Sequence, residues 1–242
     1  MASNQKINHA IWAIVPAAGI GKRMQSDIPK QYLSLNGRPV LEHTINALLQ
    51  NENIEGLVIA LQADDAYWPE IKIDSPKPVI QTKGGTERVD SVLNALNELC
   101  QYDQFGEADW VMVHDAVRPC LRQQDINRLA SEVGENKNGG LLALPVRDTM
   151  KRQHCDTASV ETTIERDNLW HALTPQYFPA IDLKAALKAA KQNSLNITDE
   201  SSAMEFAGFS PLLVQGNEDN IKITRPDDLR LAGLYLQAQE SE

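Results

Sequence analysis

The stretch from Ile11 to Tyr32 constrains the fold of this chain more than any other. It opens with an apolar run, Ile11 to Val15, which has the length and residue types of a buried parallel strand. Pro16 ends that strand because proline has no N–H group to give to a ladder. The mostly small residues from Ala17 to Gly21 follow, and they allow a sharp turn and a close approach of the backbone to a ligand. The stretch therefore predicts a buried strand that leads into a ligand-binding loop.

Basic residues gather around this loop although the chain as a whole is acidic. Between positions 16 and 38 there are four basic residues and one acid, a local charge of +3 in a chain with a formal net charge of −10. The four basic residues are Lys22, Arg23, Lys30 and Arg38. Backbone N–H groups of such a loop, backed by cations, attract phosphate groups. We expect a polyphosphate-binding loop here.

Three better-known glycine loops do not match. A P-loop needs Gly-Lys followed by Ser or Thr, but Arg23 follows here. The dinucleotide fingerprint needs a third glycine at the position that Met24 occupies. A kinase-type loop needs a downstream His-Arg-Asp, which the chain lacks. An ordinary strand-to-helix turn with solvated lysines remains the alternative.

The composition limits the partners and the compartment. A net charge of −10 argues against nonspecific binding to nucleic acid or to an anionic membrane, and the sequence has no apolar run long enough to span a bilayer. The three cysteines form no Cys-x-x-Cys pair, and we expect them to be reduced thiols in a cytoplasmic protein. The length of 242 residues fits a single α/β domain.

Strand and helix patterns alternate along most of the chain. Apolar residues at helical spacing predict a helix after Pro39 and another after Thr86, for which Thr86 is the expected cap. Residues 56–61, 76–81, 110–113, 139–146, 211–214 and 220–224 have the patterns of strands. This alternation predicts an α/β fold with a doubly wound, mostly parallel sheet and a site at the carboxyl ends of its strands.

A second glycine loop and an acidic loop follow two of these strands. Gly84-Gly85 opens the helix after Thr86, and a plain pair of helix caps would also explain it. His114-Asp115 follows the apolar run Trp110 to Val113. A carboxylate at that place could hold Mg²⁺ or a sugar hydroxyl, although it could also cap a turn. We expect His114 to be a structural imidazole.

Residues 146–167 depart from the alternating pattern. Two segments rich in β-forming residues flank the polar turn from His154 to Ser159, which predicts a protruding β-hairpin arm. A two-stranded hairpin is marginal by itself, so we expect a second copy of the chain to cover it in a homodimer.

Six motifs, taken in order, resemble one family. They are A-A-G-I-G-K-R-M with P-K-Q-Y, G-G-T-E-R-V-D-S-V, H-D-A-V-R-P, W-H-A-L-T-P-Q, T-D-E-S-S and N-I-K-I-T-R-P. The first loop is similar to that of nucleotidyltransferases of the sugar-nucleotide type, and the set most closely resembles the 2-C-methyl-D-erythritol 4-phosphate cytidylyltransferases of the non-mevalonate isoprenoid pathway. The resemblance covers residues 11 to 236. The chain departs from the family at Thr86, where an acid is common, and at Val117, where alanine is common.

The resemblance implies a Rossmann-like nucleotidyltransferase fold over residues 1–242 and a role for each matched residue. It implies that the catalytic residues are Arg23, Lys30, Arg166 and Lys222. It implies that cytidine triphosphate (CTP) is bound by Ala17, Ala18, Gly19, Gly85, Thr86, Ser91 and Ala116. It implies that a polyol phosphate is bound by Asp115, Arg118, Thr149, Thr174 and Thr198. Arg166 is expected to reach into the site of the partner subunit from the arm, residues 146–167, although pairing with a neighbouring acid would be an alternative role.

The reaction that this resemblance implies is transfer of CMP from CTP to 2-C-methyl-D-erythritol 4-phosphate, with release of pyrophosphate. Mg²⁺ or another divalent cation is expected as cofactor, held by Asp115 or by the triphosphate alone. A sister cytidylyltransferase for another polyol phosphate, such as ribitol 5-phosphate, is the close alternative. A non-catalytic nucleotide sensor on the same fold is the alternative from a different class.

Overall fold

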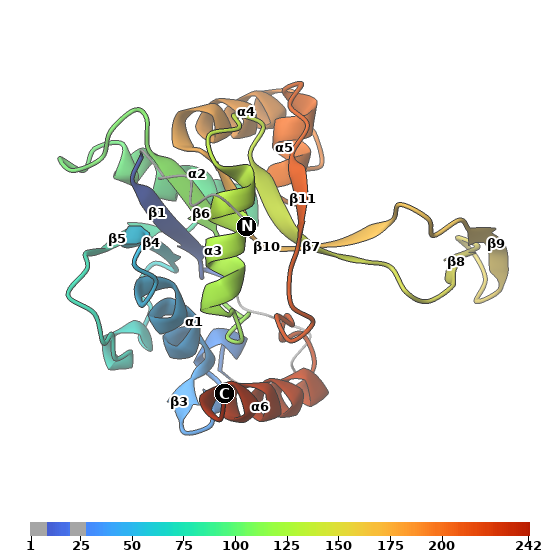
Figure 1. The fold of residues 1–242 in the computed structure, drawn as a ribbon, viewed down its shortest axis with the longest axis horizontal. Coiled ribbons are helices and arrows are strands. Elements are labelled where there is room, and N and C mark those ends of the chain that lie inside the picture. Colours follow the sequence, from blue (N-terminus) through green and yellow to red (C-terminus); the bar gives the residue numbers. More distant parts are fainter. Residues whose placement is uncertain (1–8, 20–27) are drawn as a thin grey trace.

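A seven-stranded sheet forms the centre of the computed structural model, which describes residues 9–19 and 28–242 (Figure 1). Its strands are β1 (Ile11–Pro16), β4 (Ile54–Leu61), β5 (Val79–Lys83), β6 (Trp110–Val113), β7 (Gly140–Pro145), β10 (Trp170–Pro179) and β11 (Leu212–Gln215). The strand order is β11-β7-β10-β6-β1-β4-β5. Strand β10 runs antiparallel to both of its neighbours, and the other pairs are parallel. The prediction of a mostly parallel sheet is confirmed.

Helices cover both faces of the sheet, so the fold is doubly wound. The helices are α1 (Val40–Leu49), α2 (Arg88–Leu99), α3 (Gln123–Val133), α4 (Ala180–Gln192), α5 (Glu200–Phe206) and α6 (Pro226–Glu240). Short 3₁₀ turns are η2 (Lys30–Tyr32) and η3 (Trp68–Glu70), and β2 (Ser34–Leu35) pairs with β3 (Arg38–Pro39).

The apolar run of β1 is buried because each face of the strand meets a different layer of helices. Ile11 and Val15 belong to the hydrophobic cluster that contains side chains of α1 and α3. Trp12 and Ile14 point the other way, into the cluster that contains side chains of α2, α4 and α5. Successive side chains of a strand alternate between faces, so a strand buried on both faces must be apolar throughout.

Helix α6 packs apart from these two layers. Ala232 of α6 shares a third cluster with Leu35 of β2, Val117 and Ile223. This cluster places the segment before α6 next to the loop that follows β6. The carboxyl ends of β1 and β6 and the start of α6 therefore enclose one region of the molecule.

The predicted arm is present as a hairpin that projects from the body of the protein (Figure 1). Its strands are β8 (Met150–Gln153) and β9 (Val160–Ile164), which pair antiparallel. The arm leaves β7 and returns to β10 at one point, where the N–H of Val146 donates to the carbonyl of Leu169 at 2.9 Å. Both strands are largely exposed within this chain.

Two local predictions were wrong. Residues 221–224 form no strand; the N–H of Ile223 makes one backbone bond, to the carbonyl of Val117 at 2.9 Å, and its side chain packs in the third cluster instead of in a ladder. The cap of α2 is Glu87, which forms a reciprocal capping box with Asp90, so Thr86 lies one residue outside the helix. Within the described ranges, no helix has the length and apolarity needed to cross a membrane.

Candidate active site

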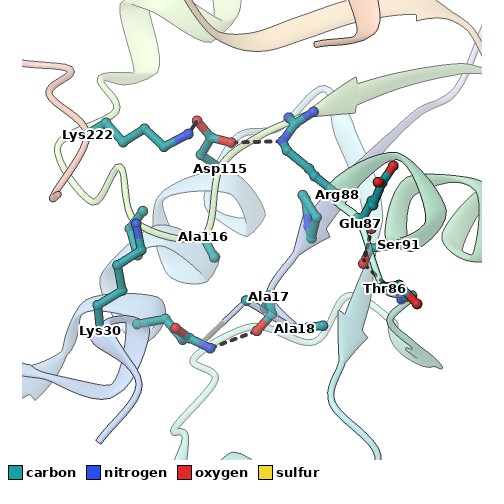
Figure 2. A pocket seen from close by; sticks show the side chains of 15 residues that line it. Ala17, Ala18, Lys30, Thr86, Glu87, Arg88, Ser91, Asp115, Ala116 and Lys222 are labelled. Atoms are coloured by element: carbon teal, nitrogen blue, oxygen red, sulfur yellow. Dashed lines mark hydrogen bonds and ion pairs between the residues drawn. The ribbon is translucent and has the colours of Figure 1, made fainter. Parts of the chain in front are cut away.

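A pocket of about 190 Å³ opens at the carboxyl ends of β1 and β6 (Figure 2). All the residues that the sequence predicts to bind the nucleotide line it: Ala17, Ala18, Gly19, Gly85, Thr86, Ser91 and Ala116. Lys30, Asp115 and Lys222 line it as well, from three separate parts of the chain. The structure thus brings the first loop, the second glycine loop and the loop after β6 to one place.

The two small-residue loops touch each other, and glycine is required where they meet. A Cβ atom built on Gly84 would lie 2.1 Å from the Cβ of Ala18, far closer than two carbon atoms can approach. The N–H of Gly85 donates to Oγ of Ser91 at 3.1 Å, which fixes the second loop to the first turn of α2. Where the two loops meet, small residues form the wall of the pocket, and their backbone groups could read the edge of a planar ring by hydrogen bonds.

The side chain of Gln31 ties the turn that carries Lys30 to the first loop. Its Nε2 donates to the carbonyl of Ala17 at 2.7 Å, and Gln31 is buried. Lys30 itself lines the pocket, and its Nζ donates to the carbonyl of Ile223 at 3.2 Å. The turn η2 and the segment that carries Lys222 therefore meet on one side of the pocket, and Arg88 and Ser91 of α2 lie on the other side (Figure 2).

Asp115 is the electrostatic centre of the pocket. Its Oδ1 accepts from Nε of Arg88 at 3.2 Å, and its Oδ2 pairs with Nε of Arg118 at 3.2 Å and with Nζ of Lys222 at 2.9 Å. Burial by itself would raise the pKa of Asp115, but the charges of Arg88, Lys222 and Arg118 outweigh it and hold that pKa well below its usual range. The carboxylate is therefore ionised at any physiological pH.

Arg88 and Glu200 are site residues that the sequence analysis missed. Arg88 lines the pocket, and its Nη1 and Nη2 donate to the two oxygens of Glu200 at 2.5 and 3.0 Å. Glu200 is buried at the start of α5. Burial would lower the pKa of Arg88, but Glu200 and Asp115 raise it. The signals in the sequence were the position of Arg88 at the start of a helix behind a glycine loop and the place of both residues inside two of the six motifs, G-G-T-E-R-V-D-S-V and T-D-E-S-S.

The pocket carries an excess of positive charge. Among the described residues at the pocket, Lys30, Arg88, Arg118 and Lys222 are positive and Glu87, Asp115 and Glu200 are negative, so these groups sum to one positive charge. The chain as a whole has a formal net charge of −10, so the charge at the pocket is opposite in sign to the charge of the protein. A bound anion with several charges, such as a triphosphate, would balance it.

Two of the predicted site residues, Arg118 and Thr174, do not line the pocket and lie behind it together with His114. Arg118 is buried, and its Nη1 donates to the carbonyl of Asn220 at 2.7 Å. The hydroxyl of Thr174 accepts from the N–H of Asp115 at 3.1 Å and bonds Nδ1 of His114 at 2.9 Å. His114 is fully buried, and its Nε2 lies 3.1 Å from the carbonyl of Arg118. These three side chains hold the Asp115 loop in shape, and His114 is the structural imidazole that the sequence predicts.

The other predicted site residues lie outside the pocket of this chain. Arg166 and Thr149 are exposed on the arm, away from the body of the protein. Thr198 is exposed just before the capping residue of α5, two positions from buried Glu200. Arg23 lies outside the described residues. The pocket of one chain thus contains the predicted nucleotide residues but only part of the predicted polyol-phosphate site.

The residues present do not fit a metal ion held by the protein. Among residues 9–19 and 28–242 there is no group of three or more His, Cys, Asp or Glu side chains that could hold one. Both oxygens of Asp115 are already bonded to cations, so a metal ion would have to displace them.

A doubly wound, mostly parallel sheet with this pocket at the carboxyl ends of its central strands defines the class of the protein as a nucleotidyltransferase with a Rossmann-like α/β fold. Comparison with known families narrows the class. Residues 11–238 match the family IspD, 2-C-methyl-D-erythritol 4-phosphate cytidylyltransferase. The chain belongs to this family.

Similar proteins match this chain over nearly its whole length. The enzyme of that name from Aliivibrio fischeri strain MJ11 is 52% identical over 233 residues, which are 96% of each chain. The one from Citrobacter koseri is 48% identical over 226 residues, 93% of this chain and 95% of the other. The crystal structure of the Francisella tularensis enzyme superimposes with a TM-score of 0.80 at 35% identity and covers 93% of this chain and 99% of that one.

Proposed function

We propose that this protein transfers CMP from CTP to 2-C-methyl-D-erythritol 4-phosphate and releases pyrophosphate. Membership of the family supports the reaction, and the small-residue walls and excess positive charge of the pocket support a nucleoside triphosphate as one substrate. The single observation that carries the proposal is the meeting of Lys30, Lys222 and Arg88 at one opening beside the two glycine loops. The three free thiols support a reducing compartment such as the cytoplasm.

The chemistry needs positioning and charge rather than a general base. The phosphate of the acceptor is already an anion at neutral pH, so its oxygen can attack the α-phosphorus of CTP directly. The new P–O bond forms as the bond to the β-phosphate oxygen breaks, and pyrophosphate leaves with that electron pair. Lys30, together with Arg23 of the first loop, would stabilise the negative charge that develops on the transferred and departing phosphates.

Lys222 would hold the attacking phosphate. Its ammonium pairs with Asp115 at 2.9 Å and lines the same pocket as the nucleotide loops. Asp115 would then serve the site by fixing Lys222 and Arg88 and by accepting from a hydroxyl of the ribose or the polyol. Backbone groups around Ala17, Gly85 and Ser91 would read the cytosine edge, and Thr198 would approach the polyol from the start of α5.

The arm would complete the site in a homodimer. Arg166 lies on the arm outside the pocket of its own chain, and both strands of the arm are largely exposed. A two-stranded hairpin gains stability when another surface covers it. A second copy of the chain would cover it and receive Arg166, whose guanidinium can grip a phosphate at two points.

Release of pyrophosphate tests the proposal. The purified protein, with CTP and Mg²⁺, is expected to release pyrophosphate with 2-C-methyl-D-erythritol 4-phosphate and far more slowly with ribitol 5-phosphate. Faster release with ribitol 5-phosphate would reassign the acceptor. No release with either acceptor, while CTP still binds, would indicate a nucleotide sensor instead of an enzyme.

A further inference from the structure

Lys222 lies on a segment, residues 217–224, that has no helix or strand to hold it. Its backbone is fixed by scattered contacts to other parts of the chain. Nδ2 of Asn217 donates to Asp125 at 2.8 Å, and Nδ2 of Asn220 donates to the carbonyl of Thr174 at 2.8 Å. The position of the Lys222 ammonium therefore depends on side chains that anchor this segment.

Asp219 is the charged anchor of the segment. It is 8% exposed, and its Oδ2 accepts from Nε of Arg122 at 2.6 Å and from Nε2 of Gln239 at 2.9 Å. Its Oδ1 is buried and has no hydrogen-bond partner in the part of the chain that the structure describes. The buried position of this carboxylate depends on the positive charge of Arg122. Without that charge the carboxylate would have a lower free energy if it moved toward water.

The side chains that bind Asp219 come from the side of the segment that faces away from the pocket. Arg122 is the residue before α3 and Gln239 lies in α6, and neither lines the pocket that holds Lys222. They line instead a second cavity of about 570 Å³ between α1, α3 and α6. Asp219 therefore connects the segment that carries Lys222 to residues that line a different cavity.

A short turn connects the anchor to Lys222. The N–H of Ile221 donates to the carbonyl of Asp219 at 2.7 Å, so the chain folds back tightly just before Lys222. Three residues can span no more than about 10 Å when fully extended, and this turn is shorter. Asp219 therefore shares with Asn220 and Ile223, which bond to Thr174 and Val117, the task of fixing the short stretch that carries Lys222.

We propose that Arg122 is a positioning residue, which holds Asp219 and through it places the ammonium of Lys222 for the acceptor phosphate. The inference rests on the proposed role of Lys222. Arg122 also pairs with Glu242, whose side chain is 61% exposed, and an exposed pair of this kind contributes little. The two carboxylates that Arg122 contacts are therefore unequal, and only the buried one bears on the site.

The test compares Arg122→Gln with a matched control, Glu242→Gln, each alone and in a Lys222→Ala background. Arg122→Gln is expected to raise the KM for 2-C-methyl-D-erythritol 4-phosphate and to lower kcat/KM by about tenfold to a hundredfold, as misplacement of a catalytic group by 1 Å does. The dissociation constant of CTP should change by less than about twofold, and Arg122→Lys should recover most of the loss because an ammonium can still reach Asp219. Glu242→Gln should behave as the unmodified protein.

Dependence on Lys222 separates positioning from a general loss of structure. If Arg122 acts through Lys222, adding Arg122→Gln to Lys222→Ala should lower kcat/KM by no more than about twofold further. The same factor in both backgrounds, or an unchanged KM for the acceptor in Arg122→Gln, would overturn the inference. If Arg122→Gln does not fold, Gln239→Leu tests the same inference. This variant removes the second donor to Asp219 and leaves the charge of Asp219 paired with Arg122. Unchanged kinetics in Lys222→Ala would instead remove the proposed role of Lys222, and the inference with it.

Discussion

Arg88 and Glu200 form a two-point ion pair across the candidate site, with Nη1–Oε1 at 2.5 Å and Nη2–Oε2 at 3.0 Å. Arg88 opens α2, behind the second glycine loop, and Glu200 opens α5, next to Thr198. The pair therefore joins the side of the pocket predicted to hold the nucleotide to the side predicted to hold the polyol. Arg88 also contacts Asp115, the residue at the centre of the site. A movement of either side of the pocket would therefore also displace Asp115.

Glu200→Gln is expected to destabilise the fold by about 2 kcal/mol, because it breaks an ion pair whose carboxylate is buried, while Arg88 is partly exposed and keeps Asp115 as a partner. Urea denaturation with an unchanged slope would measure this loss. Lys191→Gln is the control: it breaks the exposed pair between Lys191 and Asp90, and we expect less than about 1 kcal/mol. Equal losses in the two variants would contradict the special role of the buried pair.

Lys30→Ala and Arg23→Ala are each expected to lower kcat/KM by about a hundredfold or more, because each removes a positive charge that stabilises the transferred phosphate. Initial rates of pyrophosphate release measure the effect. Lys188→Ala, an exposed lysine on α4, should leave the rate unchanged. Near-normal turnover in either site variant, with circular dichroism of the folded protein, would remove that residue from the catalytic set.

Gly84→Ala is expected to weaken CTP binding strongly, because the new Cβ would lie 2.1 Å from the Cβ of Ala18 and force the two loops apart. Isothermal titration with CTP, UTP and ATP measures the affinity and, in the unmodified protein, the preference for cytosine. Gly106→Ala is the matched substitution, since its Cβ meets nothing nearer than 3.5 Å. Unchanged CTP affinity in Gly84→Ala, or equal affinity for CTP and ATP in the unmodified protein, would show that the base lies elsewhere.

The buried imidazole of His114 is expected to make stability fall in acid. Burial lowers its pKa from 6.5 to about 4, so between these values the unfolded chain binds a proton that the native state does not. Stability therefore decreases as the pH falls from about 6.5 to 4, by up to about 3 kcal/mol from this group. Urea titrations at several pH values should show a smaller loss in His114→Gln than in His154→Gln, which changes an exposed histidine of the arm. Parallel profiles in the two variants would contradict this source of acid sensitivity.

Arg166→Ala and Lys30→Ala chains are each expected to be nearly inactive alone and to recover activity when mixed. If Arg166 serves the site of the partner subunit, a mixed dimer contains one site with both defects and one intact site. Pyrophosphate release after subunit exchange should approach one working site per mixed dimer. Exchange is verified by native mass spectrometry, and verified exchange without recovery would place Arg166 in its own chain or outside the site.

The parts of the molecule that the sequence predicted correctly are those set by local pattern. The apolar run of β1 is buried on both faces and the small residues after it line the pocket, and both features follow from a few neighbouring residues. Arg88 and Glu200 were missed because they are 112 positions apart, and neither residue has a local pattern that marks it as the partner of the other. Only the folded sheet brings the starts of α2 and α5 together.

The strand expected at residues 220–224 is an error of the opposite kind, because a local pattern was present but the predicted element did not form. The alternation of Ile221, Lys222 and Ile223 has the period of a strand, but period alone does not supply a neighbouring strand. Ile223 is buried beneath α6 with Val117 and Ala232, so tertiary packing uses the apolar positions without a ladder. The irregular backbone of this segment places Lys222 beside Asp115. A regular strand paired with the sheet would instead have placed Lys222 along the sheet edge.

The hydrogen bond between Val146 and Leu169 closes the base of the arm, and Arg147 adds an exposed ion pair to Glu218, so few contacts join the arm to the rest of the fold. The chain departs from β7 and rejoins β10 at adjacent points, so residues can be added or removed between them without shifting the register of the sheet. Mutation could therefore lengthen, shorten or reshape the arm while the nucleotide pocket stayed intact. In such an architecture the arm and the pocket can evolve at different rates.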